Sequence, residues 1–595
     1  MANCIIEERL ERLRTEMKRC GIDTYIVSDR DPHMSEYPPE RWKTRKWISG
    51  FSGSAGTAVI THGKAAVWSD SRYFIQAEAQ LAGTEYLFFK EGLPATPDIY
   101  EWAACETEPS GTVAIDDKTI SYTDGEKIKE MMAAKGIKTV FGFDPFDTIW
   151  DGRPAIPDGK AYEYPLRYSG EEFSHRRSRL LKEAEAKGAD AVLLATLDDT
   201  AWSFNIRGCD IPYNPVSVAY GYISGREDVL FIDEAKTDAA LKEYLNRNGI
   251  TTMPYAAIEE YLQNLPEGEH VLADPDRTNH RLASILAEKG AAIFAASPAT
   301  LMKSIKNDTE NDGIRNAVRR DGAAMSQFLC WLDENIGKTP ISETSASRKL
   351  HEFRALQPLF TDESFATIAG YAEHGAIVHY SATEESDKEL KPEGFLLLDS
   401  GGQYLDGTTD ITRTIPLGPL TDEERRNFTA VLKGHIAVAT AVFPAGTRGA
   451  QIDTLAKTAL WKLGLTYMHG TGHGIGHFLN VHEGPQNIRP DFNPTPLRAG
   501  MTISNEPGVY IEGSHGIRIE NMILVKKRAD TVFGEFYEFE TLTRCPIDTR
   551  AIEVSQLDEA EKEWLNNYHA ETYTQLAPLV DEKTRLWLAE RCAPV

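Results

Sequence analysis

Two stretches in the first half of the chain share one pattern of apolar and polar positions. Residues 12–31 (RLRTEMKRCGIDTYIVSDRD) and residues 179–199 (RLLKEAEAKGADAVLLATLDD) both begin with apolar positions at helical spacing. A glycine then stands where each helix is expected to end, Gly21 or Gly188, and a short apolar run typical of a buried strand follows. The pattern predicts two related α/β domains. Two unrelated α/β units remain an alternative, because such units share this punctuation.

Two connectors separate these patterns from each other and from the rest of the chain. Residues 143–170 hold four prolines, a density typical of an extended connector. The second connector lies near residues 297–313, and apolar positions at helical spacing follow over residues 313–336. At roughly 150 residues per domain, the 595 residues allow about four domains. All unusual residue clusters lie after the second connector.

Composition and charge exclude several classes of protein. Apolar residues make up 41% and charged residues 26%, as in ordinary globular proteins. With 64 Lys and Arg against 90 Asp and Glu the net charge is −26, and no basic run exists, so we expect no nucleic-acid partner and no membrane binding. Seven cysteines without a CxxC pair indicate free thiols in a reducing compartment. The chain shows neither a secretory signal nor an apolar run near the roughly 20 residues of a membrane helix, so we expect a soluble, cytoplasmic protein.

Four acidic residues of the last part stand at the ends or on one face of predicted strands. Asp399 ends a buried-strand run and Asp410 follows eleven residues later, so the two can face each other across a β-ribbon. Either one alone is more typical of a cap or a turn. Glu506 ends an alternating strand that a Pro-Gly pair stops. Glu520 and Arg518 share one face of the alternating segment GIRIENMILV, and burial of that face requires a partner or a metal. An edge strand with this face in water is the alternative.

Histidine is enriched in the segment MHGTGHGIGHFLNVHEGP. It holds His469, His473, His477 and His482, although the whole chain has only 15 histidines. The glycines between them allow close backbone approach to a bound group. The segment lacks the glycine spacing of a dinucleotide site and the GK[ST] of a phosphate loop. A metal-binding or catalytic role for at least one of these histidines is therefore the favoured interpretation.

Together these segments offer two Asp, two Glu and one His for a single site. Such an oxygen-rich set favours Mn²⁺ or a similar ion over a thiolate-bound structural zinc. Four clustered carboxylates repel each other or take up protons unless cations balance them, and two divalent ions supply four charges. Two metals about 3.5–4 Å apart can hold a bridging hydroxide as the nucleophile.

The order of the motifs resembles that of a known family. An Asp, a second Asp eleven residues on, HGTGH, NEPG and RIEN occur in the same order in the dinuclear "pita-bread" metallopeptidases, which include methionine aminopeptidase, prolidase and the Xaa-Pro aminopeptidases. The segments LLDSGGQYLDGTTDITRT, WISGFSGSAGTAVI and LDDTAWSFNIRGCDIPYNPV resemble the long, three-domain aminopeptidases P of the cytosolic type. The resemblance covers essentially the whole chain. It implies an α/β (α+β) protein, with two related creatinase-N-like α/β domains at residues 1–160 and 161–305 and a pita-bread catalytic domain at 306–595.

The resemblance also implies which residues bind two divalent metal ions, with Mn²⁺ favoured and Co²⁺ or Zn²⁺ as alternatives. The implied ligands are Asp399, Asp410, His473, Glu506 and Glu520. By similarity, Asp410 and Glu520 bridge the two metals. Asp399 completes the shell of one metal, and His473 and Glu506 complete the shell of the other.

Further positions match the substrate site of the family. They are His379, His469, His482, Tyr510 and Arg518. In the implied mechanism a bridging hydroxide attacks the carbonyl before proline, Glu506 shuttles a proton to the leaving nitrogen, and His482 with His379 stabilises the oxyanion. His477 departs from the family pattern, where a small residue is usual, and we interpret it as structural.

The implied function is that of a metalloaminopeptidase. It hydrolyses the bond between the first residue of a peptide and a proline at position 2, and releases the first residue. Prolidase, which cuts only dipeptides, is the main alternative, and the three-domain length argues against it and against methionine aminopeptidase. A non-catalytic pita-bread peptide-binding protein is a further alternative, disfavoured because all five ligand positions hold residues able to bind metal. The resemblance also predicts a homodimer.

Overall fold

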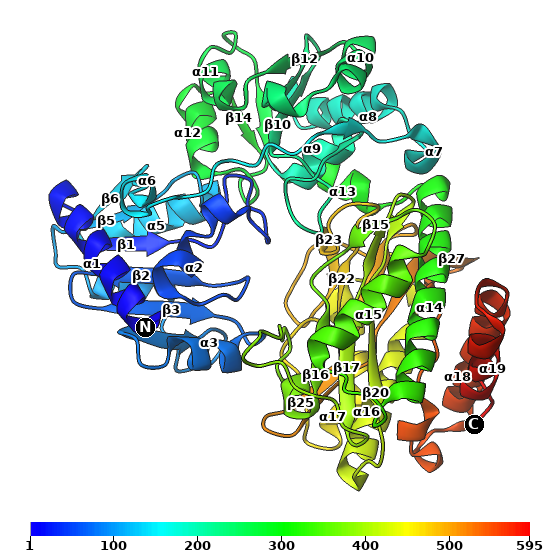
Figure 1. The fold of residues 1–595 in the computed structure, drawn as a ribbon. Coiled ribbons are helices and arrows are strands. Elements are labelled where there is room, and N and C mark those ends of the chain that lie inside the picture. The colour runs from blue at the N-terminus through cyan, green and yellow to red at the C-terminus, as the bar shows by residue number, and fades with distance from the viewer. Residues whose placement is uncertain (1) are drawn as a thin grey trace. The chain divides into compact units, whose positions relative to one another are not determined.

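The computed structural model describes residues 2–595, which divide into two compact units (Figure 1). The first unit extends to residue 164 and continues with residues 171–211 and 215–300. The second comprises residues 165–170, 212–214 and 301–595. Both units combine helices and strands, which confirms the predicted α/β class. The division into three domains with boundaries at 160 and 305 stays a prediction. Across residues 2–595, no helix is long and apolar enough to cross a membrane.

The first sheet of the N-terminal unit has six strands in the order β4-β3-β2-β1-β5-β6. They are β1 (Thr24–Val27), β2 (Thr57–Thr61), β3 (Ala65–Ser69), β4 (Tyr86–Lys90), β5 (Thr112–Ile115) and β6 (Lys138–Phe141). Strand β1 pairs antiparallel with β2 and parallel with β5. The helices of this part are α1 (Ala2–Cys20), α2 (Thr44–Ser49), α3 (Phe74–Leu81), α4 (Ile99–Cys105), α5 (Tyr122–Ala134) and α6 (Phe146–Ile149).

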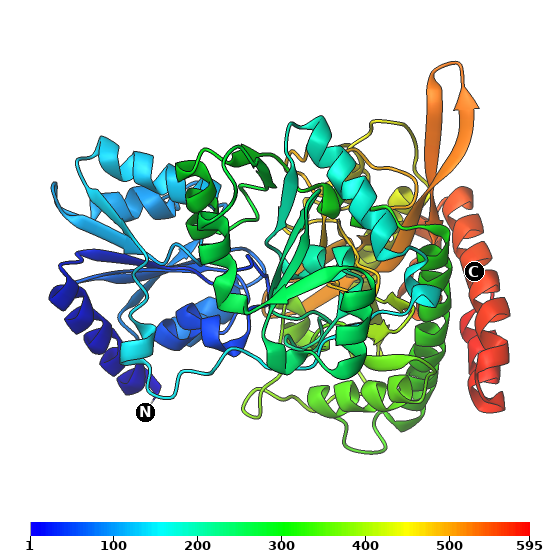
Figure 2. The same ribbon diagram turned by 90° about the horizontal axis from the view of Figure 1, so that it is seen from above.

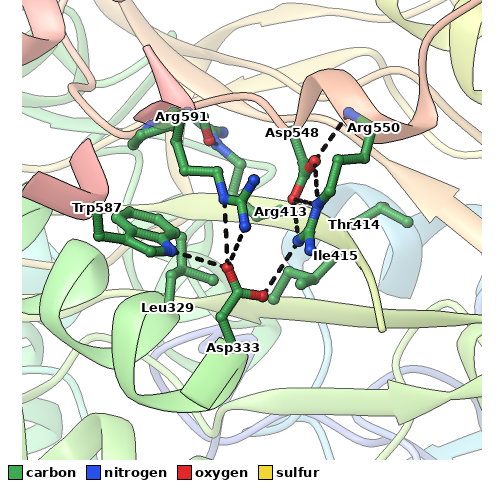
Figure 3. A pocket seen from close by; sticks show the side chains of 10 residues that line it. Leu329, Asp333, Arg413, Thr414, Ile415, Asp548, Arg550, Trp587 and Arg591 are labelled. Atoms are coloured by element: carbon green, nitrogen blue, oxygen red, sulfur yellow. Dashed lines mark hydrogen bonds and ion pairs between the residues drawn. The ribbon is translucent and has the colours of Figure 1, made fainter. Parts of the chain in front are cut away.

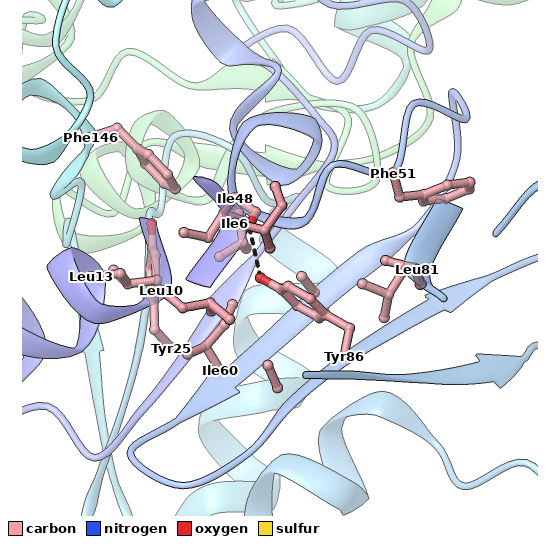
Figure 4. Packing of buried hydrophobic residues seen from close by; sticks show 14 of the residues in the cluster. Ile6, Leu10, Leu13, Tyr25, Ile48, Phe51, Ile60, Leu81, Tyr86 and Phe146 are labelled. Atoms are coloured by element: carbon pink, nitrogen blue, oxygen red, sulfur yellow. Dashed lines mark hydrogen bonds between the residues drawn. The ribbon is translucent and has the colours of Figure 1, made fainter. Parts of the chain in front are cut away.

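Helix α1 shows how the apolar pattern builds this part of the unit. Its apolar positions recur every three or four residues, so Leu10 and Leu13 are buried in one core against the sheet (Figure 4). Gly21 follows the helix with φ +69°, a left-handed conformation that glycine adopts without strain, and the helix ends there as predicted. The hydroxyl of Tyr86 donates to the carbonyl of Ile48 at 3.1 Å, so this polar group of the core is satisfied.

The second sheet of the N-terminal unit repeats the first. Its order is β12-β11-β10-β8-β13-β14, and each neighbouring pair has the same parallel or antiparallel sense as in the first sheet. The strands are β8 (Ala191–Leu194), β10 (Ala219–Ser224), β11 (Asp228–Ile232), β12 (Ile250–Met253), β13 (Val271–Ala273) and β14 (Ala292–Phe294). Helix α8 (Phe173–Ala186) precedes β8, and Gly188 between them has φ +81°. The shared topology confirms that the two patterns form related folds.

The remaining elements before residue 305 are short. They are the strands β7 (Tyr162–Glu163) and β9 (Ile206–Arg207), and the helices α7 (Leu166–Ser169), α9 (Leu197–Ser203), α10 (Ala239–Arg247), α11 (Ile258–Gln263), α12 (His280–Glu288) and α13 (Pro298–Ser304).

The second unit contains the sheets that carry the candidate site. Three strands form the sheet β16-β17-β20, namely β16 (Ile368–Tyr371), β17 (Phe395–Ser400) and β20 (Ile411–Pro416). A six-stranded sheet has the order β21-β28-β27-β24-β22-β23. Its strands are β21 (Val442–Pro444), β22 (Gly472–Gly474), β23 (Glu483–Ile488), β24 (Thr502–Asn505), β27 (Asn521–Thr531) and β28 (Gly534–Thr541). Smaller sheets hold β15 (Phe360–Glu363), β18 (Gly402–Tyr404), β19 (Gly407–Thr408), β25 (Gly508–Ile511) and β26 (His515–Arg518).

Two pairs of helices cover these sheets. Helices α14 (Asp308–Asn335) and α15 (Glu343–Ala355) share a core with the sheet of β17, and α16 (Asp422–Ala439) and α17 (Gly449–Trp461) share one with β24 and β27. The C-terminal helices α18 (Glu559–Leu576) and α19 (Glu582–Arg591) lie beside α14 (Figure 1). Helix α14 confirms the helix predicted at 313–336, ends one residue before the end of that range, and begins earlier, because Asn307 and Glu310 form a capping box.

The segment predicted as one alternating strand over residues 516–525 is two strands, so that prediction was wrong. Strand β26 pairs with β25, whereas β27 pairs with β24. The chain bends at Glu520, opposite the bend that Glu506 makes between β24 and β25. Pro507 has no N–H to continue a ladder, and its carbonyl accepts from the N–H of Ile519 at 3.3 Å. The two bends bring both glutamates to the same point. Glu520 and Arg518 are 1% exposed, which excludes the alternative of an edge strand with this face in water.

The hairpin of β27 and β28 extends away from the rest of its unit, as the orange ribbon in Figure 2 shows. Its inner end carries Asn521 and packs in the core, while the side chains of Val532 and Phe533 at its tip are 94% and 86% exposed. The hairpin therefore has a buried base next to the candidate site and a solvated outer half.

Candidate metal centre

Four of the five predicted ligands meet at one point. Asp410 precedes β20, His473 is the middle residue of β22, and Glu520 stands at the bend before β27. One ligand atom of each of these three lies within 4.8 Å of the others. His473 Nε2 lies 3.4 Å from Asp410 Oδ2 and 3.6 Å from Glu506 Oε1. The fold thus assembles these side chains from four separate segments.

Asp399, the fifth predicted ligand, adds a fourth carboxylate to the site and is held there by Arg518. Arg518 Nη2 donates to Asp399 Oδ2 at 2.6 Å, and the charge of Asp410 acts on the same carboxyl group. The other oxygen, Asp399 Oδ1, is buried and has no hydrogen-bond partner among residues 2–595. A buried carboxylate oxygen without a donor is costly, and a cation would satisfy it. We call Asp399, Asp410, Glu506 and Glu520, with His473 and Arg518, the acidic cluster.

The electrostatics of the acidic cluster show a surplus of negative charge. Burial raises the pKa of Glu520 well above its usual range, and the charges of Asp410, Asp399 and Glu506 raise it further. Burial also raises the pKa of Asp399 and of Glu506, against the opposing charge of Arg518. Although burial lowers the pKa of His473, its hydrogen bond to Asp410 and the charge of Glu506 raise that pKa to about 9. The cluster therefore attracts protons or cations.

The residues present fit a pair of divalent cations. Four carboxylates carry four negative charges, and Arg518 supplies one positive charge in return. The donor set is one imidazole and several carboxylate oxygens, which hard divalent ions prefer, and it contains no thiolate. The buried oxygen of Asp399 that lacks a donor is what an unfilled coordination position leaves in a protein interior.

A chain of hydrogen bonds leads from the acidic cluster to the other predicted substrate-site residues. Arg518 Nη1 donates to the hydroxyl oxygen of Tyr510 at 2.6 Å, and His469 Nε2 lies 2.8 Å from the same oxygen. The ring of His482 lies edge to face with that of His473, with 4.3 Å between their centroids. His482 therefore lies beside a predicted ligand, and Tyr510 and His469 are linked to the cluster through Arg518.

The structure places the last two predicted histidines differently. His379 is half-buried in the loop after η4 (Ala372–Ala376), next to Val378, whose carbonyl accepts from Arg518 Nη2 at 3.4 Å. His477 is buried, and its Nε2 lies 3.0 Å from the carbonyl oxygen of Asp406, which supports the structural interpretation of this residue.

Sequence reasoning missed several residues around the cluster. The hydroxyl of Thr412 donates to Glu520 Oε2 at 2.7 Å, and the carbonyl of Thr412 accepts from the N–H of Glu520 at 3.1 Å. The position of Thr412 two residues after Asp410 on the same strand could have pointed to it. Lys303 and Lys306 both pair with Glu483, which follows His482, and all three side chains are buried. Nothing in the sequence links residues 303 and 306 to 483, which are brought together only by the tertiary fold.

Comparison with protein families assigns each part of the chain. Residues 312–527 match the metallopeptidase family M24, and residues 535–595 match the C-terminal region of peptidase M24. Residues 9–144 and 152–310 each match a creatinase/prolidase N-terminal domain. The two N-terminal matches cover the two sheets of related topology.

Similar proteins align over nearly the whole chain. A probable Xaa-Pro aminopeptidase P of Laccaria bicolor is 42% identical over 99% of this chain and 93% of its own length. Aminopeptidase P2 of Arabidopsis thaliana is 39% identical over 99% of this chain and 89% of its own. The Xaa-Pro dipeptidase of Bacillus anthracis is 26% identical with a TM-score of 0.51, and it covers only 63% of this chain.

One solved structure matches the whole fold. The X-prolyl aminopeptidase of Caenorhabditis elegans, described as a cytosolic enzyme with a di-nuclear active site, superimposes with a TM-score of 0.96 at 34% identity. The match covers 99% of this chain and all of that one. Together with the relatives above, this full-length similarity shows that the chain belongs to the Xaa-Pro aminopeptidases of metallopeptidase family M24.

Proposed function

We propose that the protein removes the first residue of peptides that carry proline at position 2. The acidic cluster is the observation that carries the proposal: three buried carboxylates and the half-buried Glu506 surround one histidine and one arginine, and this surplus of negative charge attracts cations. Full-length similarity to aminopeptidases P supports the substrate class. The substrates we propose are therefore short peptides with a free N-terminus and a proline after the first residue.

We assign the cations to five residues of the cluster. The proposed ligands are Asp399, Asp410, His473, Glu506 and Glu520, with Asp410 and Glu520 shared between two ions. Mn²⁺ is the ion we favour, because one imidazole among carboxylates suits hard divalent cations, and Co²⁺ and Zn²⁺ are the alternatives. When bound, such a pair supplies a Lewis acid for the scissile carbonyl and makes water acidic enough to act as nucleophile near neutral pH.

Glu506 is the proposed proton shuttle. Its Oε1 lies 3.6 Å from His473 Nε2 and accepts from the hydroxyl of Ser504 at 3.3 Å. Burial raises the pKa of Glu506, which brings the carboxylate closer to the range where it can both accept and donate a proton. The carboxylate takes a proton from the attacking water and passes it to the nitrogen of the leaving proline.

The histidines and the arginine bind and orient the substrate in this proposal. His482, beside His473, and His379 donate to the oxygen that becomes negative during attack. Arg518 donates to Asp399 and favours its charged form, and it positions Tyr510, which in turn positions His469. Proline has a fixed φ and no amide hydrogen, so ordinary peptidases bind such bonds poorly, whereas a site shaped for the ring can recognise it.

We further propose that the enzyme works in the cytoplasm as a homodimer. The seven cysteines, all among the described residues, form no disulfide, and the C. elegans relative is described as cytosolic. The dimer follows from the family resemblance. Sedimentation at micromolar concentration tests it, because a dimer has twice the 66.3 kDa of one chain.

Peptide hydrolysis after removal of metal tests the main proposal. The protein is treated with a chelator, and Mn²⁺, Co²⁺ or Zn²⁺ is then added back to it. The release of the first residue from X-Pro-Y peptides is measured before and after this addition. We expect release of the first residue only after metal is restored, with the highest rate for Mn²⁺. A prolidase would instead cut the dipeptide X-Pro and leave the tripeptide intact.

Two glutamine substitutions separate catalysis from peptide binding. Glu506→Gln should abolish turnover, whereas Glu512→Gln, at an exposed position in the turn between β25 and β26, should behave like the parent protein. Unchanged hydrolysis by Glu506→Gln would sink the proposed proton shuttle. A parent protein that binds X-Pro-Y peptides without cutting them would favour the peptide-binding alternative.

A further inference from the structure

A second polar layer lies directly behind the two glutamates of the acidic cluster. Asn505 precedes Glu506 and Asn521 follows Glu520, and the two asparagines are paired in the ladder of β24 and β27. Adjacent residues of an extended chain point to opposite faces, so the asparagines face away from the ligands. We call Arg413, His435, Asn505 and Asn521 the back layer. Arg413 is 3% exposed and the other three are fully buried.

Arg413 joins the strand of Asp410 to the bend of Glu520. Its Nη1 donates to the carbonyl of Glu520 at 2.6 Å and to the carbonyl of Thr412 at 2.9 Å. Its Nη2 donates to Asn521 Oδ1 at 2.8 Å. Because the N–H of Glu520 donates to Thr412, the main chain of Glu520 is held on both its N–H and its C=O side.

The same guanidinium also reaches the C-terminal region of the chain. Arg413 Nε donates to the carbonyl of Pro546 at 3.0 Å, and Nη2 donates to the carbonyl of Cys545 and the hydroxyl of Tyr568, each at 2.8 Å. Tyr568 lies on α18. The acceptors of Arg413 are main-chain, amide and hydroxyl oxygens, and these hydrogen bonds offset the burial of its charge.

The C-terminal region is anchored a short distance from Arg413. Asp333 of α14 accepts from Arg550, from Trp587 Nε1 at 2.8 Å and from Arg591 of α19, around a pocket that Arg413 also lines (Figure 3). These contacts attach α19 to α14, and α18 packs against both of these helices. Tyr568 therefore presents its hydroxyl to Arg413 from a firmly attached helix.

His435 completes the layer from helix α16. His435 Nδ1 lies 3.1 Å from the carbonyl of Asn505, and Asn505 Nδ2 donates to the carbonyl of His435 at 2.9 Å. Asn521 Nδ2 lies 3.0 Å from His435 Nε2. The carbonyl can only accept and the amide nitrogen can only donate, so the imidazole is neutral with its proton on Nδ1. Burial, with the charge of Arg413, lowers the pKa of His435 to about 3, in agreement with this state.

We infer that Arg413 and His435 are positioning residues for the two glutamate ligands, an inference that rests on the proposed metal-dependent function. Arg413 fixes the main chain at Glu520, and His435 fixes the residue before Glu506 and the residue after Glu520. The back layer thus sets the spacing of two carboxylates that come from different bends. It also assigns a role to the C-terminal region, which supplies Tyr568 and the carbonyls that hold the guanidinium in place.

Metal affinity tests this inference without reference to peptide cleavage. Arg413→Met, His435→Gln, His435→Asn and Tyr568→Phe are compared with the parent protein by calorimetric titration of the metal-free proteins with Mn²⁺. Loss of residues behind metal ligands typically costs roughly 10–100-fold in metal affinity or activity. We expect losses of this size in Mn²⁺ affinity for Arg413→Met and His435→Gln, and a smaller loss for Tyr568→Phe. In peptide hydrolysis, these variants should lower kcat more than they change KM.

A matched control separates positioning from general destabilisation. His33 in the N-terminal unit is also buried and also has a polar partner at each ring nitrogen, Ala195 O at 2.7 Å and Tyr255 Oη at 3.0 Å. His33→Gln should lower the melting temperature of its unit and leave the affinity for Mn²⁺ unchanged. Arg413→Lys should recover part of the affinity, because it restores one donor group.

The outcomes also separate this inference from the proposed function. If the His435 variants and Tyr568→Phe are destabilised like His33→Gln but bind Mn²⁺ as tightly as the parent, the positioning role is wrong. These milder variants decide the question even if Arg413→Met fails to fold. If the parent binds Mn²⁺ but does not cut X-Pro-Y peptides, the proposed function fails, and the affinity comparison still decides the role of the back layer.

Discussion

Two clusters of buried charged residues each include one of two neighbouring residues of strand β17, and they differ in the balance of positive and negative charge. The acidic cluster includes Asp399. At the next residue, Ser400 accepts from Arg354 Nη2 at 3.0 Å, and Arg354 Nε donates to Asp321 Oδ1 at 2.8 Å. The hydroxyl of Tyr404 donates to the same oxygen at 3.0 Å. We call Asp321, Arg354, Ser400 and Tyr404 the paired cluster. It holds one negative and one positive charge.

The difference teaches how a functional site is distinguished from a structural one when both contain buried charge. In the paired cluster the charges cancel within the chain, and its aspartate accepts from the arginine and the tyrosine. In the acidic cluster four carboxylates face one arginine, and the pKa values of three carboxyl groups are raised. A buried surplus of charge requires something from outside the chain, whereas a balanced pair does not.

Removing one carboxylate from the acidic cluster should have the largest effect, with opposite signs for activity and stability. Glu520→Gln should lower kcat and Mn²⁺ affinity by more than the roughly 10–100-fold typical of residues behind the ligands. The metal-free variant should nevertheless melt at a higher temperature than the metal-free parent at pH 7. Because the pKa of Glu520 is raised in the folded protein, the parent loses stability as the pH rises above about 4.5, and the variant loses less because only Asp399 and Glu506 still contribute.

Thermal denaturation after chelation, from pH 4 to pH 8, measures this difference. Saturating Mn²⁺ should reverse the order of the two melting temperatures, since only the parent binds the ion tightly. A metal-free variant less stable than the parent at every pH would contradict the surplus of negative charge.

The same kind of change in the paired cluster should act on stability alone. Asp321→Asn leaves the charge of Arg354 buried without a counter-charge, which typically costs about 3–5 kcal/mol. Urea denaturation measures the loss, and Mn²⁺ affinity of the folded variant should stay near that of the parent. The double variant Asp321→Leu with Arg354→Met should be less destabilised than Asp321→Asn, because no unpaired charge remains. A double variant as unstable as the single one would mean that packing, not charge balance, decides the cost.

The contribution of His435 to stability should depend on pH in the direction opposite to that of Glu520. The pKa of His435 is lowered in the folded protein to about 3 by burial and by the charge of Arg413, whereas a solvated histidine has a pKa near 6.5. The neutral ring contributes stability above about pH 6.5, and this contribution is lost as the pH falls toward 3, at up to about 1.4 kcal/mol per pH unit. His435→Gln should therefore be less stable than the parent at pH 7, and the difference should shrink on acidification. A difference independent of pH would show that the histidine is not neutral when buried.

How far the sequence predicted these clusters depends on where the signal lies. The ligands were predictable because each stands in a motif of unusual residues, such as His473 between glycines, and because the resemblance to a family fixed their order. The paired cluster and the back layer were not predicted. Arg354 lies in an ordinary helical pattern, and His435 contacts Asn505, which is 70 residues away in the chain. Such partners are chosen by tertiary packing, which leaves no local pattern.

The fold shows the same division between local and tertiary signals. Gly21 and Gly188 mark helix ends by local conformation, so the repeated helix–glycine–strand pattern was correctly predicted. The segment around Glu520 alternates as one long strand would. Its bend arises because the pairing strand is interrupted at Pro507, a constraint that lies in another segment of the chain.

The smallest effect on stability is expected from a substitution that removes one partner of a solvent-exposed ion pair. Glu535 on the outer half of the β27–β28 hairpin pairs with Lys527 at 2.8 Å, and Glu535→Gln leaves that lysine without this partner, just as Asp321→Asn does to Arg354. Water screens the lysine, and exposed ion pairs contribute little to stability. The melting temperature should therefore change by less than about 2 °C and Mn²⁺ affinity should not change. A loss comparable to that of Asp321→Asn would mean that the outer hairpin is covered by another surface in solution, and that burial rather than the pair itself sets the cost of unbalanced charge at both places.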